Sequence, residues 1–372
     1  MGIGLYIHIP FCDKKCPYCD FYSLSGSDSL KSEYKSAVVR CIKGYADLID
    51  HTVDTVFFGG GTPPLIGADA LCELLEECRT SFELSDDCEI TLEANPNTVD
   101  SDMLKKLRMS GFNRISFGVQ SALDNELITL GRLHTFDKAK QVITEAKNVG
   151  FDNISADLML GIPGQSVSSA IESAFRIAEL DVTHISAYML KIEEGTPFGR
   201  NRNELMLPDE DEICDIYTAV CEKLNELLFE QYEISNFAKS GYRCRHNLKY
   251  WNCDEYIGIG PAAHSFFNGV RFYYKKDIEE FILKSKKGID FYTLEDEPSG
   301  SVSEYMMLRL RLTDGLFFKD LYDRFGVKLP QDILEKARRL EKGGFIKMDE
   351  RHISLTNKGN LVSNLVISSL AF

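Results

Sequence analysis

The sequence predicts an α/β protein, an open and partial (β/α)6 barrel followed by a small, mostly helical domain of winged-helix type. Three observations support this fold class. Short apolar segments alternate with amphipathic ones through the first two thirds of the 372 residues. The loops between them are short, which is typical of a parallel sheet with crossover helices. Six such units fall short of the eight that close a barrel, so we expect the sheet to stay open.

The barrel elements follow from periodicity and from the residues that end each segment. Apolar segments predict strands at residues 4–10, 55–58, 89–93, 114–117, 154–160 and 184–190. Helical periodicity predicts helices at residues 29–45, 69–80, 101–109, 137–149, 166–180 and 209–230. Ser101 is a typical helix N-cap, and Gly111 and Gly150 follow predicted helix ends.

After about residue 235 the regular alternation ends. Residues 243–269 are rich in aromatic residues and glycine, and we expect them to be irregular. Helices are then predicted at 303–312, 318–325 and 331–342, strands at 345–348 and 353–355, and a closing helix from 357. This order is similar to a small winged-helix module. The expected domains are therefore a barrel (1–235), a connecting region (236–300) and a C-terminal domain (301–372).

Composition limits the function and the compartment. The formal net charge is −15, which disfavours nucleic acid as a partner. The mixed charges of the C-terminal module indicate a packing or partner domain rather than a DNA reader. Most of the eleven cysteines are scattered, as in reduced cytoplasmic proteins. The chain enters a strand almost at once, and the apolar tail at 361–372 is too short to span a bilayer, so we expect neither a signal peptide nor a membrane span.

The most informative motif is a group of three cysteines, Cys12, Cys16 and Cys19. The loop that contains them is short enough for the three sulfurs to converge. Thiolates at this spacing suit an iron–sulfur cluster or zinc. Three ligands leave one metal position without a protein group, so another molecule must complete it. Zinc and a disulfide are the alternatives, but no second CxxC follows and a disulfide would leave an odd thiol.

Other polar or glycine-rich motifs also lie where predicted strands end. Residues 59–62, Gly-Gly-Gly-Thr, follow the second strand. Glycines let a backbone approach a ligand closely, although a tight strand-to-helix turn would use the same residues. The run lacks the Lys-Ser/Thr ending of a Walker loop. Because the carboxyl ends of parallel strands share one edge, we expect these motifs to line one pocket.

Four single polar residues extend this pattern along the same edge: Glu93, Gln120, Arg132 and Asp157. Each alone is typical of a surface or helix-cap position. Together they suit a ligand that has an amino group, a carboxylate and ribose hydroxyls. Arg132 could pair with the carboxylate through two hydrogen bonds.

Residues 6–19, the 59–63 run and residues 115–120 resemble radical S-adenosylmethionine (SAM) proteins, in particular the oxygen-independent coproporphyrinogen III oxidase group. The resemblance extends over essentially the whole chain. It implies that the three cysteines hold a [4Fe–4S] cluster and that SAM completes the fourth iron through its amino and carboxylate groups. It further implies that the reduced cluster splits SAM into methionine and a 5′-deoxyadenosyl radical.

The same resemblance assigns ligand contacts. For one SAM site it implies Tyr6, Gly60 and Glu93. For a second, SAM-like site it implies the residues Tyr18, Gly61, Thr62, Gln120, Arg132 and Asp157.

Two features separate the chain from the oxidases. Phe21 stands where they have a further cysteine, and Tyr6 lies too near the start for their N-terminal extension. The chain is more similar to haem chaperones of the HemW type, whose HNxxYW motif matches residues 246–251, and residues 256–266 resemble the segment that follows in that family. His246 could then bind haem iron, with the neighbouring rings against the porphyrin. A buried structural histidine and a metal site with Cys244 and Cys253 are the alternatives.

The function that this resemblance implies is haem binding and delivery. The expected cofactors are the [4Fe–4S] cluster, SAM and haem. The expected partners are haem-accepting proteins, including membrane-bound ones met at the membrane surface, and a reductant such as flavodoxin or ferredoxin if SAM is cleaved. The alternative function is the decarboxylation of coproporphyrinogen III to protoporphyrinogen IX, which Phe21 disfavours. A winged-helix redox regulator is a third class, which the acidic net charge disfavours.

Overall fold

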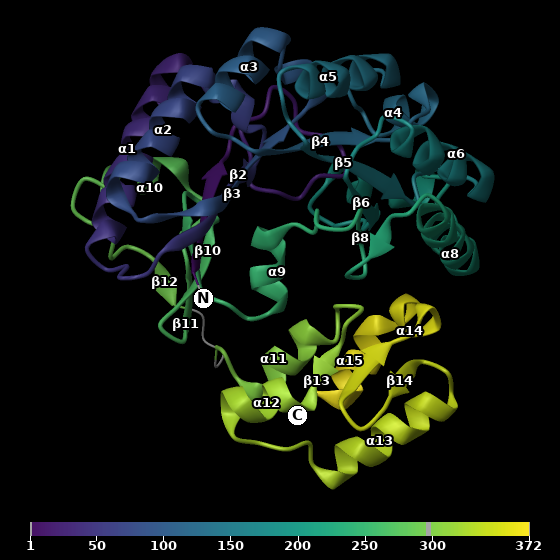
Figure 1. Cartoon of the computed structure of the whole chain (residues 1–372). Helices are drawn as coiled ribbons and strands as arrows, with labels where there is room; N and C mark the ends of the chain where they lie inside the picture. Colours follow the sequence, from purple (N-terminus) through teal and green to yellow (C-terminus); the bar gives the residue numbers. More distant parts are fainter. Residues whose placement is uncertain (1, 295–298, 372) are drawn as a thin grey trace.

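The structure, a computed structural model, describes residues 2–294 and 299–371 and is built on one curved 12-stranded sheet (Figure 1). The strand order is β12-β11-β10-β9-β1-β2-β3-β4-β5-β6-β8-β7. Its six central strands pair in parallel and in chain order, as the alternating sequence predicts. They are β1 (Ile3–Ile9), β2 (Val53–Gly60), β3 (Leu84–Ala94), β4 (Arg114–Gln120), β5 (Asn153–Leu160) and β6 (His184–Met189). This confirms the partial barrel.

Helices follow the strands and cover the outer, convex face of the sheet (Figure 1). Side-chain caps fix where several of them begin: Ser27 caps α1, and Asp209 forms a capping box at the start of α8. Helix α8 ends at Glu226, four residues before the predicted end. The barrel helices are α1 (Asp28–Ala46), α2 (Ala68–Ser81), α3 (Ser101–Met109), α4 (Asp124–Thr129), α5 (Phe136–Asn148), α6 (Val167–Ala178), α7 (Pro197–Arg200) and α8 (Glu210–Glu226).

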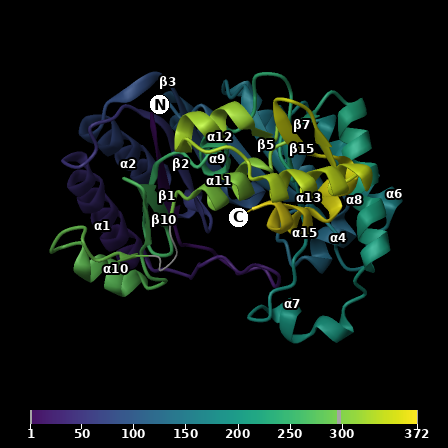
Figure 2. The ribbon, with the colours of Figure 1, turned by 90° about the horizontal axis from the view of Figure 1, so that it is seen from below.

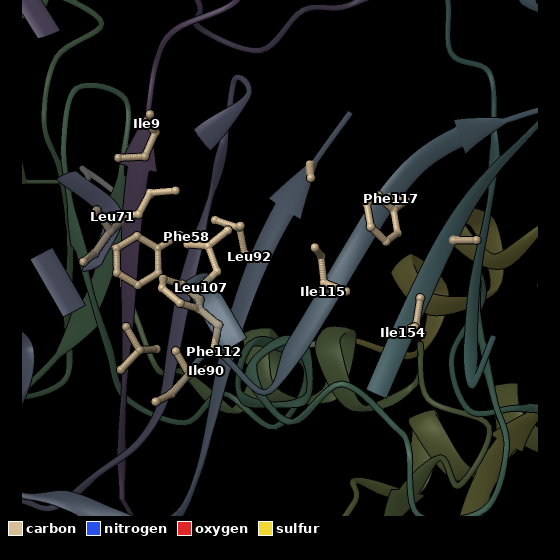
Figure 3. Close-up of a cluster of buried hydrophobic side chains, with 14 of the residues drawn as sticks. Ile9, Phe58, Leu71, Ile90, Leu92, Leu107, Phe112, Ile115, Phe117 and Ile154 are labelled. Atoms are coloured by element: carbon tan, nitrogen blue, oxygen red, sulfur yellow. The ribbon is translucent and has the colours of Figure 1, made fainter. Parts of the chain in front are cut away.

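The main hydrophobic core fills the space between the sheet and these helices. Figure 3 shows Phe58, Leu92 and Ile115 from neighbouring strands beside Leu71 of α2 and Leu107 of α3. All five side chains are fully buried. Because side chains alternate across a strand, the residues between these apolar ones face the concave side. The outer core thus holds the strands in place, and the concave face is left for polar residues.

The prediction of an irregular segment at 243–269 is wrong. This region contains a helix and two strands, and the chain from 236 to 294 extends the barrel sheet at both edges. β9 pairs in parallel with β1, and β8 pairs antiparallel with β6. The elements are β7 (Glu230–Gln231), β8 (Asn236–Ala238), α9 (Arg245–Trp251), β9 (Tyr256–Ile259), β10 (His264–Phe267), β11 (Val270–Tyr273), α10 (Ile278–Lys284) and β12 (Thr293–Leu294).

The C-terminal residues form a second, smaller core around a three-stranded sheet of order β13-β15-β14. Figure 2 shows helices α11 to α13 in front of the barrel sheet. A short strand between the first two helices completes the winged-helix pattern, and the closing helix is divided into two. The elements are α11 (Val302–Arg309), β13 (Leu316–Phe317), α12 (Phe318–Phe325), α13 (Gln331–Lys342), β14 (Ile346–Met348), β15 (His352–Leu355), α14 (Asn357–Leu361) and α15 (Ser363–Leu370).

Across residues 2–294 and 299–371, no helix has both the length and the apolar character needed to cross a membrane. The eleven cysteines of the chain are all free thiols.

Candidate functional site

One cavity of about 830 Å³ lies at the carboxyl ends of the parallel strands. Residues from all six of these strands and from the loops after them line it, which confirms that the strand-end motifs share one pocket. Twelve of the thirteen candidate site residues line the cavity: Tyr6, Cys12, Cys16, Tyr18, Cys19, Gly60, Gly61, Thr62, Glu93, Gln120, Arg132 and Asp157. The exception is His246.

The cysteines lie on the loop after β1, here called the Cys loop (residues 11–24). Phe11 is buried against Tyr34, with a ring separation of 5.5 Å, and fixes the start of the loop. Backbone bonds between Cys12 and Leu24, and between Leu24 and Pro10, close the base of the loop. The three thiols are partly exposed towards the cavity, so the fold holds the loop at its base and presents the sulfurs to a ligand.

The glycine turn (residues 59–62) packs directly beneath the Cys loop. The Gly61 amide donates to the carbonyl of Ile9, and the Thr62 amide donates to that of Phe11, both at 2.8 Å. A Cβ atom on Gly61 would lie 2.6 Å from the Phe11 carbonyl oxygen, which no side chain tolerates. Glycine is therefore required here because two backbones touch, which supports the tight-turn interpretation.

Two carboxyl groups lie on the concave face of the sheet, Glu93 on β3 and Asp157 on β5. Burial, followed by the nearby charge of Asp157, raises the pKa of Glu93 to about 7. Burial raises the pKa of Asp157 to about 6, against hydrogen bonds from Ser186 and Ser116. Glu93 also accepts a bond from the Gly60 amide at 3.0 Å. Ionisation of these two buried carboxyl groups is therefore unfavourable, and a cationic ligand beside them would stabilise their charged forms.

Arg132 connects the polar edge to the Cys loop. Its guanidinium donates to the Gly118 carbonyl at 2.7 Å and to Asn95, and one nitrogen lies 3.6 Å from the Cys16 sulfur. Gln120 follows a register shift at the end of β4 and has a φ of 71°, an uncommon conformation for a residue with a side chain. The bulge directs this part of β4 towards the cavity.

Sequence reasoning missed several residues of the cavity. The missed residues Arg114, Ser116 and Gly118 occupy alternate positions of β4 with the predicted Gln120, and all four line the cavity. A period of two along the predicted strand is the signal that would have found them. Arg114 is 2% exposed, and its Nε atom has no hydrogen-bond partner within the described parts of the chain. A buried, unsatisfied donor beside a cavity indicates that a ligand oxygen would be stabilised there.

Part of the cavity lining is a cluster of aromatic side chains. We call this cluster the aromatic end and define it by its lining residues, which come from β1, β2, α9, β9 and β10: Tyr6, Phe57, Tyr250, Tyr256 and His264. Lys276 and Ala262 also line the cavity. The cavity lining therefore combines thiols and polar groups with aromatic rings.

Comparison with known proteins agrees with this arrangement. Residues 6–177 match the Radical SAM superfamily, and residues 297–362 match the HemN C-terminal domain. The protein named Heme chaperone HemW of Bacillus subtilis (strain 168) is 35% identical over 373 residues, 98% of either chain. That of Escherichia coli (strain K12) is 41% identical over 268 residues, 70% of this chain and 69% of the relative.

The chain belongs to the HemW family of radical SAM proteins. A solved structure, coproporphyrinogen III oxidase (HemN) from Escherichia coli, matches all of this chain and 90% of its own with a TM-score of 0.85. At 21% identity this likeness shows the fold alone.

Membership of the radical SAM superfamily implies a [4Fe–4S] cluster and SAM. In this HemW-family chain, no three His, Cys, Asp or Glu side chains among residues 2–294 and 299–371 are placed to hold a single metal ion. A cubane cluster has a different requirement, because each thiolate binds a different iron and the sulfurs stand further apart. Three soft thiolate donors around one cavity fit that donor set, although they do not converge on one point as we expected.

The structure places His246 outside the cavity lining. Its imidazole is 1% exposed and stacks on Phe57, with both ring nitrogens in 2.8 Å hydrogen bonds, one to Thr55 and the other to Tyr250. Burial lowers its pKa to about 3. With both nitrogens engaged and no place in the cavity lining, His246 joins α9 to β2, which favours the alternative of a buried structural histidine. The HNxxYW motif instead brings Asn247 and Tyr250 to the cavity.

Proposed function

We propose that this protein is a haem chaperone that binds a [4Fe–4S] cluster, SAM and haem, and passes haem to acceptor proteins. One observation carries this proposal: a single cavity joins three thiols and a polar rim to an aromatic end. The relatives named Heme chaperone HemW, at 30–41% identity, support the same activity.

The three cysteines are the cluster ligands in this proposal. Arg132 donates towards the Cys16 sulfur, which lies 3.6 Å from one guanidinium nitrogen. Thr62 lies 3.5 Å from the Cys12 sulfur and accepts a bond from Asn95, which orients its hydroxyl group. Three protein ligands leave one iron for SAM.

The polar rim positions SAM in this proposal. Glu93 and Asp157 provide negative charge for the sulfonium and hydroxyl groups, and Arg114 provides a donor for a carboxylate oxygen. A bound, reduced cluster would supply one electron to SAM. Reduction of the cluster would need a reductant protein such as flavodoxin or ferredoxin. The contacts proposed for one SAM are Tyr6, Gly60 and Glu93, and those for a second, SAM-like ligand are Tyr18, Gly61, Thr62, Gln120, Arg132 and Asp157.

We place haem at the aromatic end, where flat rings suit a porphyrin and Lys276 suits a propionate. We further propose a cytoplasmic protein, because its eleven thiols are all free and the cluster requires reduced cysteines. Its haem acceptors include membrane-bound proteins in this proposal.

The experiment is a haem titration followed by a transfer assay. Purified protein, reconstituted anaerobically, should bind about one ferric haem per chain and lose it to an apo-haem acceptor mixed with it. Tyr256→Ala removes a ring from the aromatic end and should weaken haem binding, whereas Phe175→Ala, an exposed ring on α6, is the matched control. Absence of haem binding by the unmodified protein would remove the proposed function.

A further inference from the structure

Strand β4 brings a buried cation to the two carboxyl groups of the cavity. It lies between β3, which carries Glu93, and β5, which carries Asp157. Ser116 of β4 stands opposite Glu93 in the strand register and donates to Asp157 at 3.3 Å. Arg114, two residues earlier on the same strand, faces the same side and lines the same cavity. One strand therefore connects both carboxyl groups to a guanidinium group.

The guanidinium of Arg114 is buried, yet no other side chain holds it. It is 2% exposed, its Nε atom has no hydrogen-bond partner, and no carboxylate within the described ranges of the chain forms an ion pair with it. The neighbouring Glu89 accepts bonds from the backbone amides of Arg245 and His246, both at 3.1 Å, and so holds the start of α9. The charge of Arg114 therefore acts through space on the groups around it, which include Asp157.

The two carboxyl groups depend on such a charge because burial opposes their ionisation. Burial raises the pKa of Glu93 to about 7 and that of Asp157 to about 6. Arg114 acts on both in the opposite direction, and Arg132 adds to this effect at Asp157. The other groups that act on the pair come from the neighbouring elements: Tyr6 of β1, the Gly60 amide of β2, Ser116 of β4, Ser186 and Tyr188 of β6, and Tyr250 of α9.

We propose that Arg114 is a positioning residue for SAM, because its charge keeps the buried carboxyl groups of Glu93 and Asp157 ionised. This inference rests on the proposed function, in which these two groups face the sulfonium and hydroxyl groups of SAM. An ionised carboxylate attracts the sulfonium cation, whereas a protonated one carries no charge. This role is additional to the hydrogen bond that Arg114 offers to a carboxylate oxygen. Without the charge of Arg114, the two groups keep their protons to a higher pH, and SAM has to displace them.

The test measures the affinity for labelled SAM by equilibrium dialysis of the reconstituted full-length protein at several pH values. Affinity of the unmodified protein should rise with pH through about 6 to 7, as the two carboxyl groups lose their protons. Arg114→Met and Arg114→Gln both remove the charge. Each should move the rise to higher pH by about one unit, so that SAM binds about three- to tenfold more weakly at pH 7 and almost normally at about pH 8.5.

Two further variants control for the loss of an arginine side chain. Arg114→Lys keeps the charge and should keep the pH profile of the unmodified protein. Arg108→Met removes a partly buried arginine of α3, outside the cavity lining, and should also leave the profile unchanged. Electron paramagnetic resonance (EPR) of the reduced cluster with saturating SAM at about pH 8.5 should be the same in all these proteins. A changed signal in Arg114→Met and Arg114→Gln would mean that they disturb the cavity, and would overturn the role of the charge.

The outcomes separate this inference from the proposed function. If the unmodified protein binds SAM and the variants without the charge have the same pH profile, the role of Arg114 is overturned and the proposed function stands. An equal loss of affinity at every pH would also overturn it, as would a lysine variant that behaves like Arg114→Met. Failure of the unmodified protein to bind SAM at any pH would remove the SAM site of the proposed function, and this inference with it.

Discussion

Glu93 shows how the cavity alters the acid–base chemistry of a single residue. Its pKa is raised from the usual 4.5 to about 7, first by burial and then by the nearby Asp157. The fold therefore favours the protonated form. The stability that this contributes is fully present below about pH 4.5 and is lost as the pH rises through about 7. Without SAM, ionised Glu93 destabilises the protein at neutral pH.

Glu93→Gln tests this dependence. Glutamine keeps an oxygen that can accept the Gly60 amide bond but carries no charge. The free energy of unfolding of the variant should equal that of the unmodified protein near pH 4.5 and exceed it by about 1–3 kcal/mol at pH 8. Thermal unfolding across this pH range, without SAM, measures the difference. A constant difference at all pH values would contradict the raised pKa.

His246 provides a second prediction for a single residue. His246→Ala creates a buried cavity and leaves the hydroxyl groups of Thr55 and Tyr250 without their partner. We expect a loss of about 2–4 kcal/mol in the free energy of unfolding, with haem affinity retained. Chemical denaturation and haem titration of one preparation separate the two effects. Loss of haem binding without loss of stability would restore His246 as the iron ligand.

The sequence identified only some of the polar residues on the cavity strands. Glu93, at the end of a predicted strand, and Asp157, inside one, are conspicuous as single carboxylates in apolar segments. Arg114 and Ser116 were missed because they lie within a strand that is buried along its whole length. The role of His246 depended on a sheet contact with Thr55, 191 residues away, which no local pattern contains.

At the scale of elements, the Cys loop and the glycine turn act as one unit. The loop follows β1 and the turn follows β2, and these strands are parallel neighbours. The contact between the Gly61 amide and the Ile9 carbonyl joins them. The position of the sulfurs therefore depends on a residue that touches none of them.

Gly61→Ala tests this coupling. The added Cβ atom would meet two backbone oxygens, of Phe11 and Ile9, within 2.8 Å, so the loop must move. We expect a loss of about 1–3 kcal/mol in stability and a lower iron content after reconstitution. Gly195→Ala is the matched control, because a Cβ atom there would have no atom of the described residues within 4 Å. Equal iron content in the two variants would contradict the coupling.

The barrel strands were predictable because each is a short apolar segment between a helix and a turn. Observed β5 and β6 differ from their predicted ends by a single residue. The region 243–269 was not predictable in the same way. Its strands β9 and β10 have four residues each, and β9 is stabilised by pairing with β1, more than 240 residues earlier in the chain. Short strands of this kind are defined by their partner rather than by their own periodicity.

At the scale of the whole molecule, the C-terminal domain is packed against the HNxxYW helix α9. Arg311 lies over the Trp251 ring at 4.9 Å, and Arg324 donates to the Asn252 carbonyl at 2.9 Å. Tyr256 and Phe266, from the barrel sheet, belong to the hydrophobic core of the C-terminal domain. The C-terminal domain therefore supports the helix and strands that form the aromatic end of the cavity.

Removal of residues 299–372 tests this dependence. The truncation exposes Tyr256, Phe266 and Cys253, which are buried in the complete chain. We expect a lower midpoint of thermal unfolding, a tendency to aggregate and loss of haem binding. Thermal unfolding and gel filtration of the truncated and complete chains provide the comparison. A truncated protein with the same midpoint and haem affinity would contradict the supporting role.

Motif spacing and the order of elements were enough to predict the superfamily and the partial barrel, because both are local properties. The contact between the C-terminal domain and α9 was not predictable, because it joins two segments whose own patterns give no sign of it. The fold shared with HemN does not decide the reaction, since that likeness rests on 21% identity. Experiments on the residues of the cavity must therefore decide which activity the protein has.

The most direct test is anaerobic reconstitution with iron and sulfide, followed by EPR of the reduced protein with and without SAM. We expect about four irons and four sulfides per chain, and a signal that changes when SAM is added. Cys12→Ala should lose the cluster, whereas Cys214→Ala, outside the cavity, should keep it. A single iron per chain, or a cluster signal that SAM leaves unchanged, would contradict the central claim.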